Sequence, residues 1–205
     1  MRIGLIVDGQ SEYEALPAII PSLEEQTGHV IVHPVKADIQ PKAPIGVIAR
    51  ACHKGIRALS LREVELVVIL FDREDRSECP GELASLVGAV LDRQTDVPFS
   101  IVIKDQTFEH WLISDLEALE ASPGRFHLSN ATRRSIAPNK ADQAPALTLL
   151  QAAVRNQAYD KVKDSKRILE RADPMRVAAS SRSFRRFLRY LEHPSYLHQS
   201  RNPAS

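Results

Sequence analysis

Acidic side chains follow two apolar segments of this sequence, at the point where each segment ends. The first segment runs from Ile3 to Val7 and the second from Val64 to Phe71. The acids are Asp8 and Glu12 after the first segment, and Asp72, Glu74 and Asp75 after the second. Carboxylate oxygens are preferred ligands of Mg²⁺, and a divalent ion relieves the repulsion among gathered acids, as in phosphoryl-transfer sites. The pattern therefore favours a site for Mg²⁺ or Mn²⁺.

Each acidic group also has a purely structural explanation. Glu12 would stand in the first turn of a helix, where the helix dipole favours an acid without any ligand. The second group could form a solvated turn in which Arg73 and Arg76 pair with the acids. The metal hypothesis rests on the two groups occurring together, because the turn would be the better explanation for the second group alone.

Two further positions could contribute to such a site. Glu109 lies in the segment from Phe108 to Leu112, in the first turn of an expected helix. Lys161 opens a basic stretch that extends to Arg189. Lys and Arg beside a metal site can clamp a phosphodiester or stabilise a leaving oxyanion, although most charged residues on helices simply face solvent.

Several other chemistries lack their sequence signatures. There is no HExxH motif, which leaves a metalloprotease-type zinc site without support. GxGxxG, Walker A and GxSxG motifs are also missing, which removes the common nucleotide-binding and serine-hydrolase explanations. Cys52 and Cys79 form no CxxC pair, so a cysteine zinc module is excluded and a reducing compartment is favoured.

The bulk composition is that of a soluble globular protein. The chain has 205 residues, 43% hydrophobic and 26% charged, which is enough for one substantial core but cramped for two domains. Lys and Arg number 27 against 26 Asp and Glu, so net charge alone indicates no polyanionic partner. Because no apolar stretch suits a signal peptide or a membrane span, we expect a cytoplasmic protein with no membrane partner.

Strands and helices are predicted to alternate through the first half of the chain. The expected strands are Ile3 to Val7, Val30 to Val35, Val64 to Phe71 and Phe99 to Ile103. The expected helices between them are Ser11 to Leu23, Ile45 to Leu59 and Pro80 to Leu91. In the first of these, Ser11 and Glu14 would form a capping box, and Gly28 would end the helix. Such alternation favours a mainly parallel sheet with helices on both faces, and ligands of these sheets bind beyond the carboxyl ends of the strands.

From about residue 108 the sequence shows helical patterns and no clear strand. The clearest patterns cover residues 141–155, 163–172 and 184–191. We therefore expect one α/β domain over residues 1–192, with a mainly parallel sheet of about four strands and a helical part over about 108–192. Residues 193–205 are polar and contain proline, which predicts a flexible tail.

Together these motifs resemble the Toprim-type fold. The segments that carry the resemblance are IVDGQSE, LFDRED, FEHWLISD and the closing region from Tyr159 to Leu191. More narrowly, the chain resembles an uncharacterised Toprim-like bacterial family of unknown function (DUF family 4276), related to the Toprim nuclease domains of the overcoming-lysogenization-defect proteins. The resemblance extends over nearly the whole chain.

The resemblance implies roles for single residues. Asp8 would stand in for the family's usual Glu as a metal ligand or general acid, and Lys161 would be the lysine that stabilises the transition state. The other implied metal ligands are Glu12, Asp72 with Glu74 or Asp75, and Glu109. The segment Asp72 to Asp75 takes the place of the family's plain Asp-x-Asp.

Three functions are compatible with these expectations. The leading hypothesis is a Mg²⁺- or Mn²⁺-dependent nuclease that cuts DNA or RNA with metal-activated water; such relatives often act with an ATPase partner in antiphage defence. The second is a non-catalytic Toprim-like module that binds nucleic acid or an ATPase partner. The third is a metal-dependent phosphohydrolase or nucleotidyl transferase acting on a small molecule, which would need an enclosed pocket.

Overall fold

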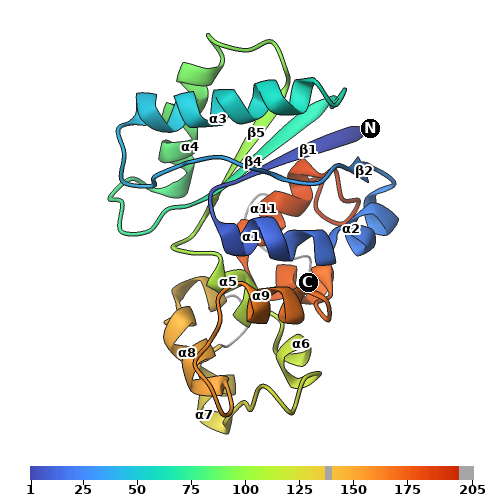
Figure 1. Ribbon diagram of the computed structural model, residues 1–205, viewed down its shortest axis with the longest axis vertical. Helices are drawn as coiled ribbons and strands as arrows, with labels where there is room; N and C mark the ends of the chain where they lie inside the picture. The colour runs from blue at the N-terminus through green and yellow to red at the C-terminus, as the bar shows by residue number, and fades with distance from the viewer. Residues whose placement is uncertain (137–139, 199–205) are drawn as a thin grey trace.

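The protein is built around one parallel sheet, and the predicted α/β class is confirmed. The structure is a computed structural model, which describes residues 1–136 and 140–198 (Figure 1). Strands β1 (Arg2–Val7), β4 (Leu66–Asp72) and β5 (Phe99–Lys104) lie side by side in that order. The short strands β2 (Val30–Ile31) and β3 (Val35–Lys36) both pair with the other edge of β1. Every one of these pairings is parallel.

The register of the three long strands brings their carboxyl ends to one edge. Val7 of β1 lies opposite Leu70 of β4, and Asp72 of β4 lies opposite Lys104 of β5. Residues that follow or end these strands therefore meet in one small region, even though they are far apart in the sequence.

The predicted second strand from Val30 to Val35 is divided into β2 and β3. Pro34 lies between them, and proline has no backbone N–H to donate to a neighbouring strand. The hydrogen-bond ladder with β1 is therefore interrupted and resumes at Val35.

The predicted first helix is likewise broken into three pieces. These are α1 (Gln10–Ala15), the 3₁₀ helix η1 (Leu16–Ala18) and α2 (Ile20–Thr27). Pro17 and Pro21 each fall in the first turn of a new piece, where the missing N–H costs nothing. The stop at Gly28 is as predicted: its φ of 69° is left-handed, and its N–H donates to the Glu24 carbonyl oxygen.

Helices cover both faces of the sheet. Figure 1 shows α3 (Ile45–Ser60) and α4 (Pro80–Leu91) together on one side, where they pack on strand residues such as Ile69 and Phe71. The opposite face, which includes Val68 and Leu70, packs against the N-terminal helices and the helices from the second half of the chain. Because both faces are buried, the strands are apolar at successive positions, as the sequence pattern indicated.

The described residues of the second half are mainly helical, as expected, and they include an isolated antiparallel bridge between Phe126 and Val154. Its helices are α5 (Glu109–Ile113), α6 (Leu116–Glu120), α7 (Asn130–Ser135), η2 (Ala141–Gln143), α8 (Ala146–Ala153), α9 (Lys163–Leu169), α10 (Pro174–Ser180) and α11 (Arg182–Tyr190). One apolar core extends from β1 through these helices, so they share a packing unit with the sheet. Within the described ranges, no helix is both long and apolar enough to cross a membrane.

Two side chains at the start of the predicted tail pack against the fold. His193 and Tyr196 are both buried, and the two rings contact each other. His193 Nε2 also lies 3.2 Å from the side-chain oxygen of Gln26 at the far end of the sequence. Residues 199–205 lie outside the described part of the chain, and the flexible tail stays a prediction.

An aromatic cluster joins α5 to α11 beneath the sheet. The Trp111 ring stacks on Phe187 at 5.4 Å between centroids and meets Phe184 edge-on at 4.9 Å. Its indole N–H donates to Ser183 Oγ at 2.8 Å, so the polar atom of this buried ring has a partner. This cluster fixes the helical region against the sheet close to the edge where the strands end.

We predict that Phe187→Ala lowers the free energy of unfolding by about 3–5 kcal/mol, because it leaves a cavity against Trp111. Urea denaturation followed by the fluorescence of Trp111, the one tryptophan of the chain, measures the loss. Arg189→Ala is the control, since Arg189 is exposed on the same helix. A Phe187→Ala protein no less stable than the control would contradict the packing described.

Candidate active site

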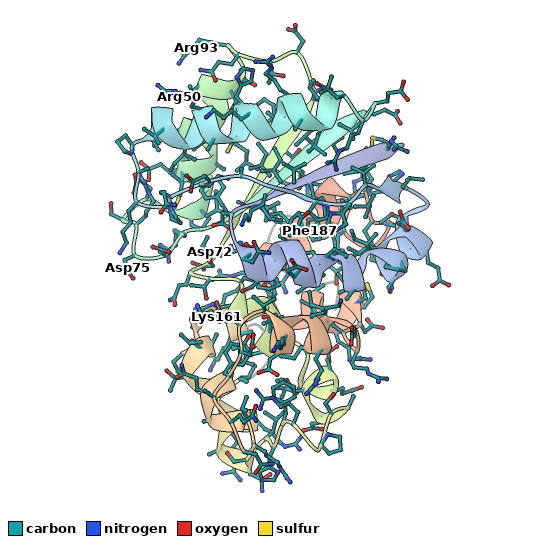
Figure 2. All side chains as sticks on the ribbon, in the orientation of Figure 1. Arg50, Asp72, Asp75, Arg93, Lys161 and Phe187 are labelled. Atoms are coloured by element: carbon teal, nitrogen blue, oxygen red, sulfur yellow. The ribbon has the colours of Figure 1, made fainter. Side chains whose placement is uncertain are left out.

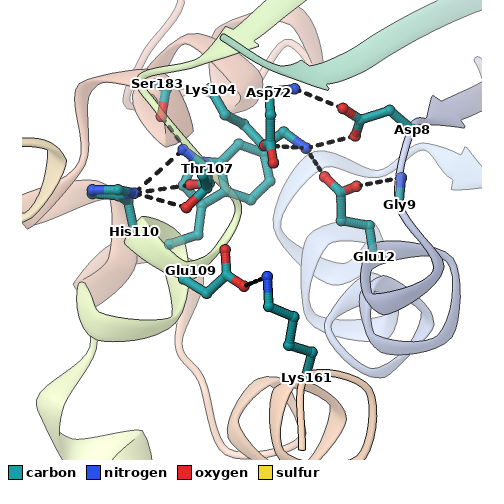
Figure 3. A network of polar contacts seen from close by, with 11 residues as sticks. Asp8, Gly9, Glu12, Asp72, Lys104, Thr107, Glu109, His110, Lys161 and Ser183 are labelled. Atoms are coloured by element: carbon teal, nitrogen blue, oxygen red, sulfur yellow. Dashed lines mark hydrogen bonds and ion pairs between the residues drawn. The ribbon is translucent and has the colours of Figure 1, made fainter. Parts of the chain in front are cut away.

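Three carboxylates converge at the carboxyl edge of the sheet (Figure 3). Asp8 follows β1, Asp72 ends β4 and Glu12 lies in the first turn of α1. One oxygen of each lies within 4.8 Å of the other two. Asp8 is also held directly to the neighbouring strand, because its Oδ2 accepts the backbone N–H of Asp72 at 2.8 Å. The structure thus brings together the two acidic groups that the sequence separates.

The turn between β1 and α1 fixes the orientation of Glu12. The helix begins after Gly9, and the Gly9 N–H donates to Glu12 Oε2 at 2.8 Å. A Cβ atom at position 9 would lie 2.7 Å from that oxygen, so only glycine fits without displacing the carboxylate. The predicted capping box at Ser11 and Glu14 is therefore wrong by two residues, and Glu14 instead accepts a hydrogen bond from Gln10.

A buried lysine occupies the centre of the cluster. Lys104 at the end of β5 is 0% exposed. Its Nζ lies 3.0 Å from Asp8 Oδ1 and 2.9 Å from Asp72 Oδ1, and it also contacts Glu12 Oε1. Burial lowers the pKa of the Lys104 ammonium, while the charge and hydrogen bond of Asp8 oppose that shift. The nearby carboxylates therefore favour the charged form of Lys104 against the effect of burial.

The cluster holds more negative than positive charge. The pKa of Asp72 is raised well above its ordinary value, mainly by burial and also by the negative charges of Asp8 and Glu109. Glu12 Oε1 and Asp72 Oδ1 are buried and receive no hydrogen bond of regular geometry, although both contact the Lys104 ammonium. Buried oxygens left short of donors in an acidic cluster are the ligands that a divalent cation would satisfy. These residues therefore fit Mg²⁺ or Mn²⁺, and their role as ligands stays a prediction.

Glu109 and Lys161 form a second pair next to this cluster. Lys161 Nζ lies 3.0 Å from Glu109 Oε1, and Figure 3 shows the Lys161 side chain directed toward the acids. Burial works against ionisation of Glu109, but its backbone hydrogen bond and Lys161 together lower the pKa of this carboxyl group. Glu109 is thus an ionised neighbour of the three acids and is held by a lysine from the helical region.

The structure places Glu74 and Asp75 differently from the other predicted ligands. Asp75 is 87% exposed, pairs with Lys42 at 3.1 Å and points away from Asp72 in Figure 2. Glu74 lies close enough for its charge to raise the pKa of Asp72, but it is outside the group of three converging oxygens. The geometry therefore supports Asp72 as a ligand and does not support Asp75.

Sequence reasoning missed Lys104 altogether. The signal was a single lysine directly after the mainly apolar run from Phe99 to Ile103, just as Asp8 and Asp72 directly follow the apolar runs before them. A lysine at the end of a strand is normally a surface residue, so its burial becomes visible only through the pairing with Asp72.

His29 and His33 have the spacing of a helical zinc-binding pair, but no helix contains them. His29 ends up 3.4 Å from a carboxylate oxygen of Glu192, and His33 Nδ1 lies 3.2 Å from the Pro34 carbonyl oxygen. Neither belongs to the carboxylate group found among the described residues.

The fold and the site together define an α/β protein with an acidic cluster at the carboxyl edge of a parallel sheet. The chain belongs to the family described as Domain of unknown function (DUF4276), which matches residues 7–192. That match includes every residue of the cluster and also Lys161. No curated protein and no solved structure matches the chain. The family is thus confirmed, whereas the relation to the Toprim-type fold stays a prediction.

We predict that Lys104→Met lowers the free energy of unfolding by about 3–5 kcal/mol, because it leaves three carboxylates without their buried partner. Mn²⁺ or Mg²⁺ should recover much of this loss, because a divalent ion can then compensate the acids. Urea denaturation with and without metal measures both effects.

Lys42→Met is the matched control for this substitution. It breaks the ion pair between Lys42 and Asp75, and both of these side chains are exposed. The substitution should therefore change the free energy of unfolding little and should not alter the response to metal. A divalent ion that stabilises Lys104→Met no more than the wild type would contradict a cation site among these acids.

Proposed function

We propose that this protein is a divalent-metal-dependent nuclease that hydrolyses phosphodiester bonds of nucleic acid. The observation that supports it most is the convergence of Asp8, Glu12 and Asp72 within 4.8 Å, with more acid than the one buried ammonium neutralises. Such a surplus attracts a divalent cation, and carboxylate clusters of this kind serve phosphoryl-transfer enzymes.

The residues divide into three roles in this proposal. Asp8, Glu12 and Asp72 would hold the metal, whose chemistry is to neutralise charge on the phosphate and to make water acidic enough to attack it. The Gly9 N–H and the Asp72 N–H each bind a carboxylate oxygen, and so they fix the orientations of Glu12 and Asp8 before any ligand arrives. Preorganised groups of this kind need no rearrangement when charge develops.

Two lysines are candidates for stabilising negative charge on the phosphate. Lys161 was assigned this role by resemblance, and it extends toward the acids while paired with Glu109. Lys104 is closer, because its ammonium contacts all three carboxylates. We propose that Lys104 is the inner cation of the site and that Lys161 is the outer one, which a substrate phosphate can draw away from Glu109.

The arrangement at this end of the protein favours a polymer over an enclosed small molecule. Lys161 lines an open hollow in which basic side chains outnumber acidic ones. An open basic surface suits a phosphodiester backbone, whereas a phosphohydrolase for a small molecule would need to surround its substrate.

A non-catalytic module is the second candidate, and one observation favours it. The Lys104 ammonium already contacts each of the three carboxylates, which is the arrangement of a buried ion-pair centre that stabilises a fold without binding a metal. In this alternative the protein binds nucleic acid or an ATPase partner without turnover. The ATPase partner and a role in antiphage defence remain part of the proposal on the strength of the resemblance alone.

We predict that the wild type cleaves plasmid DNA or RNA in Mn²⁺ and that Asp72→Asn reduces the rate about 100-fold or more, because it removes a ligand carboxylate while keeping the side-chain shape. Cleavage is followed by gel electrophoresis, and circular dichroism verifies that the variant is folded.

Asp75→Asn is the matched control, since it makes the same change of charge three residues away on an exposed side chain. It should cleave at the wild-type rate. Absence of cleavage by the wild type on both substrates, together with no binding of Mn²⁺ in calorimetry, would favour the non-catalytic module. Equal cleavage by Asp72→Asn and the wild type would remove this site from the reaction.

A further inference from the structure

A hollow of about 650 Å³ opens next to the candidate site, against the start of α9. Its charged lining consists of four cations and two acids, namely Arg125, Lys161, Lys163, Arg167, Asp160 and Asp164. The volume is in the range of pockets that bind small ligands or parts of larger ones. The lining therefore carries an excess of positive charge on a surface of useful size.

The two acids of the hollow are already engaged. Asp164 is buried and accepts two hydrogen bonds from the Arg125 guanidinium, at 2.8 and 2.6 Å. Asp160 Oδ1 accepts the backbone N–H groups of Val162 and Lys163, each at 3.0 Å. Asp164 is thus fully engaged by Arg125, whereas Asp160 keeps Oδ2 for a loose ion pair with Lys163.

Two cations of the hollow remain open to a ligand. Lys163 is 85% exposed and makes only a long ion pair with Asp160, with 3.9 Å between Nζ and Oδ2, which a phosphate in solvent can replace. Arg167 is exposed, and no carboxylate of the described residues lies within ion-pair distance of it. An arginine guanidinium matches the geometry of a phosphate group with two parallel hydrogen bonds.

The wall of the hollow is fixed by Arg125. Besides Asp164, its guanidinium donates to the carbonyl oxygens of Arg155 and Ala158, at 3.2 and 2.9 Å. The Asp160 N–H in turn donates to Asp164 Oδ2 at 2.8 Å. The loop before α9 is therefore tied down by side chains, and a ligand would meet a surface whose shape is already formed.

Lys161 connects the hollow to the acidic cluster. It lines the hollow and also pairs with Glu109, whose charge reaches Asp72 and Lys104. A nucleic-acid strand with one phosphate at the acids would therefore continue over Lys161 into the hollow.

We propose that this hollow is the binding site for the sugar–phosphate backbone of the substrate strand, with Lys163 and Arg167 contacting the phosphates next to the bond to be cut. This inference rests on the proposed function and adds the surface that holds its substrate. Contacts of this kind are to phosphate rather than to bases, so they give affinity without sequence preference.

The test is the binding of a short labelled DNA or RNA oligonucleotide to the double variant Lys163→Ala/Arg167→Ala, measured by fluorescence anisotropy over a range of salt concentrations. Binding is measured in two series without Mn²⁺, one containing EDTA and one containing Ca²⁺, so that the oligonucleotide is not cleaved during the measurement. We expect the slope of log affinity against log salt to fall by about 1.4–1.8, because each lost phosphate contact contributes about 0.7–0.9. Both side chains are exposed, so the variant should fold like the wild type.

The matched control is Arg50→Ala/Arg93→Ala. It makes the same change of net charge on α3 and just after α4, across the sheet from Lys161, and Figure 2 shows both arginines toward the top of that view. It should leave the slope unchanged. Equal slopes for the two double variants would overturn the inference, as would a mononucleotide that binds as tightly as the oligonucleotide, or a wild type that binds no oligonucleotide in either series.

The outcomes separate this inference from the proposed function. A wild type that binds through Lys163 and Arg167 but cuts nothing in Mn²⁺ would keep the backbone site and refute the nuclease. A wild type that cuts, together with a Lys163→Ala/Arg167→Ala variant that binds and cuts equally well, would keep the nuclease and refute the backbone site.

Discussion

The contact of the Lys104 ammonium with three carboxylates is the interaction on which the carboxyl edge of the sheet depends. Taking a charge out of water is costly unless an opposite charge meets it, and here one buried cation meets Asp8, Glu12 and Asp72 together. The pairing of Asp72 with Lys104 across β4 and β5 sets this geometry, and the hydrogen bond from Asp72 to Asp8 extends it to β1. Electrostatics and strand register thus reinforce each other at the point where a ligand would bind.

The helical region contributes to the same edge. Its core is continuous with the sheet through Trp111, Phe184 and Phe187, and it supplies the Glu109–Lys161 pair beside the acids. The basic hollow at the start of α9 lies on the same side of the sheet. Negative charge at the centre and positive charge along the border thus come from neighbouring parts of one surface, and this charge pattern is the basis of the proposed function.

Much of this fold could be predicted from the sequence, and the reasons are local. Runs such as Leu66 to Phe71 indicate buried parallel strands, and an acid directly after each run must emerge at the carboxyl edge. The position of Lys104 could not be predicted, because its burial depends on strand neighbours rather than on its own segment. Asp75 shows the opposite case: adjacency in sequence to Asp72 suggested a shared site, but the turn after β4 directs Asp75 toward Lys42.

The distance along the chain between Asp8 and Lys104 has a consequence for how the protein is made. The two residues are 96 positions apart, and synthesis proceeds from the N-terminus. Asp8 and Glu12 are therefore synthesised well before Lys104, and until then the two carboxylates lack the buried cation with which they pair. Bringing such distant residues together carries a cost in loop-closure entropy, which slows folding. Because Lys104 ends β5, we expect the charge centre to form only when β5 pairs with β4 and completes this edge of the sheet.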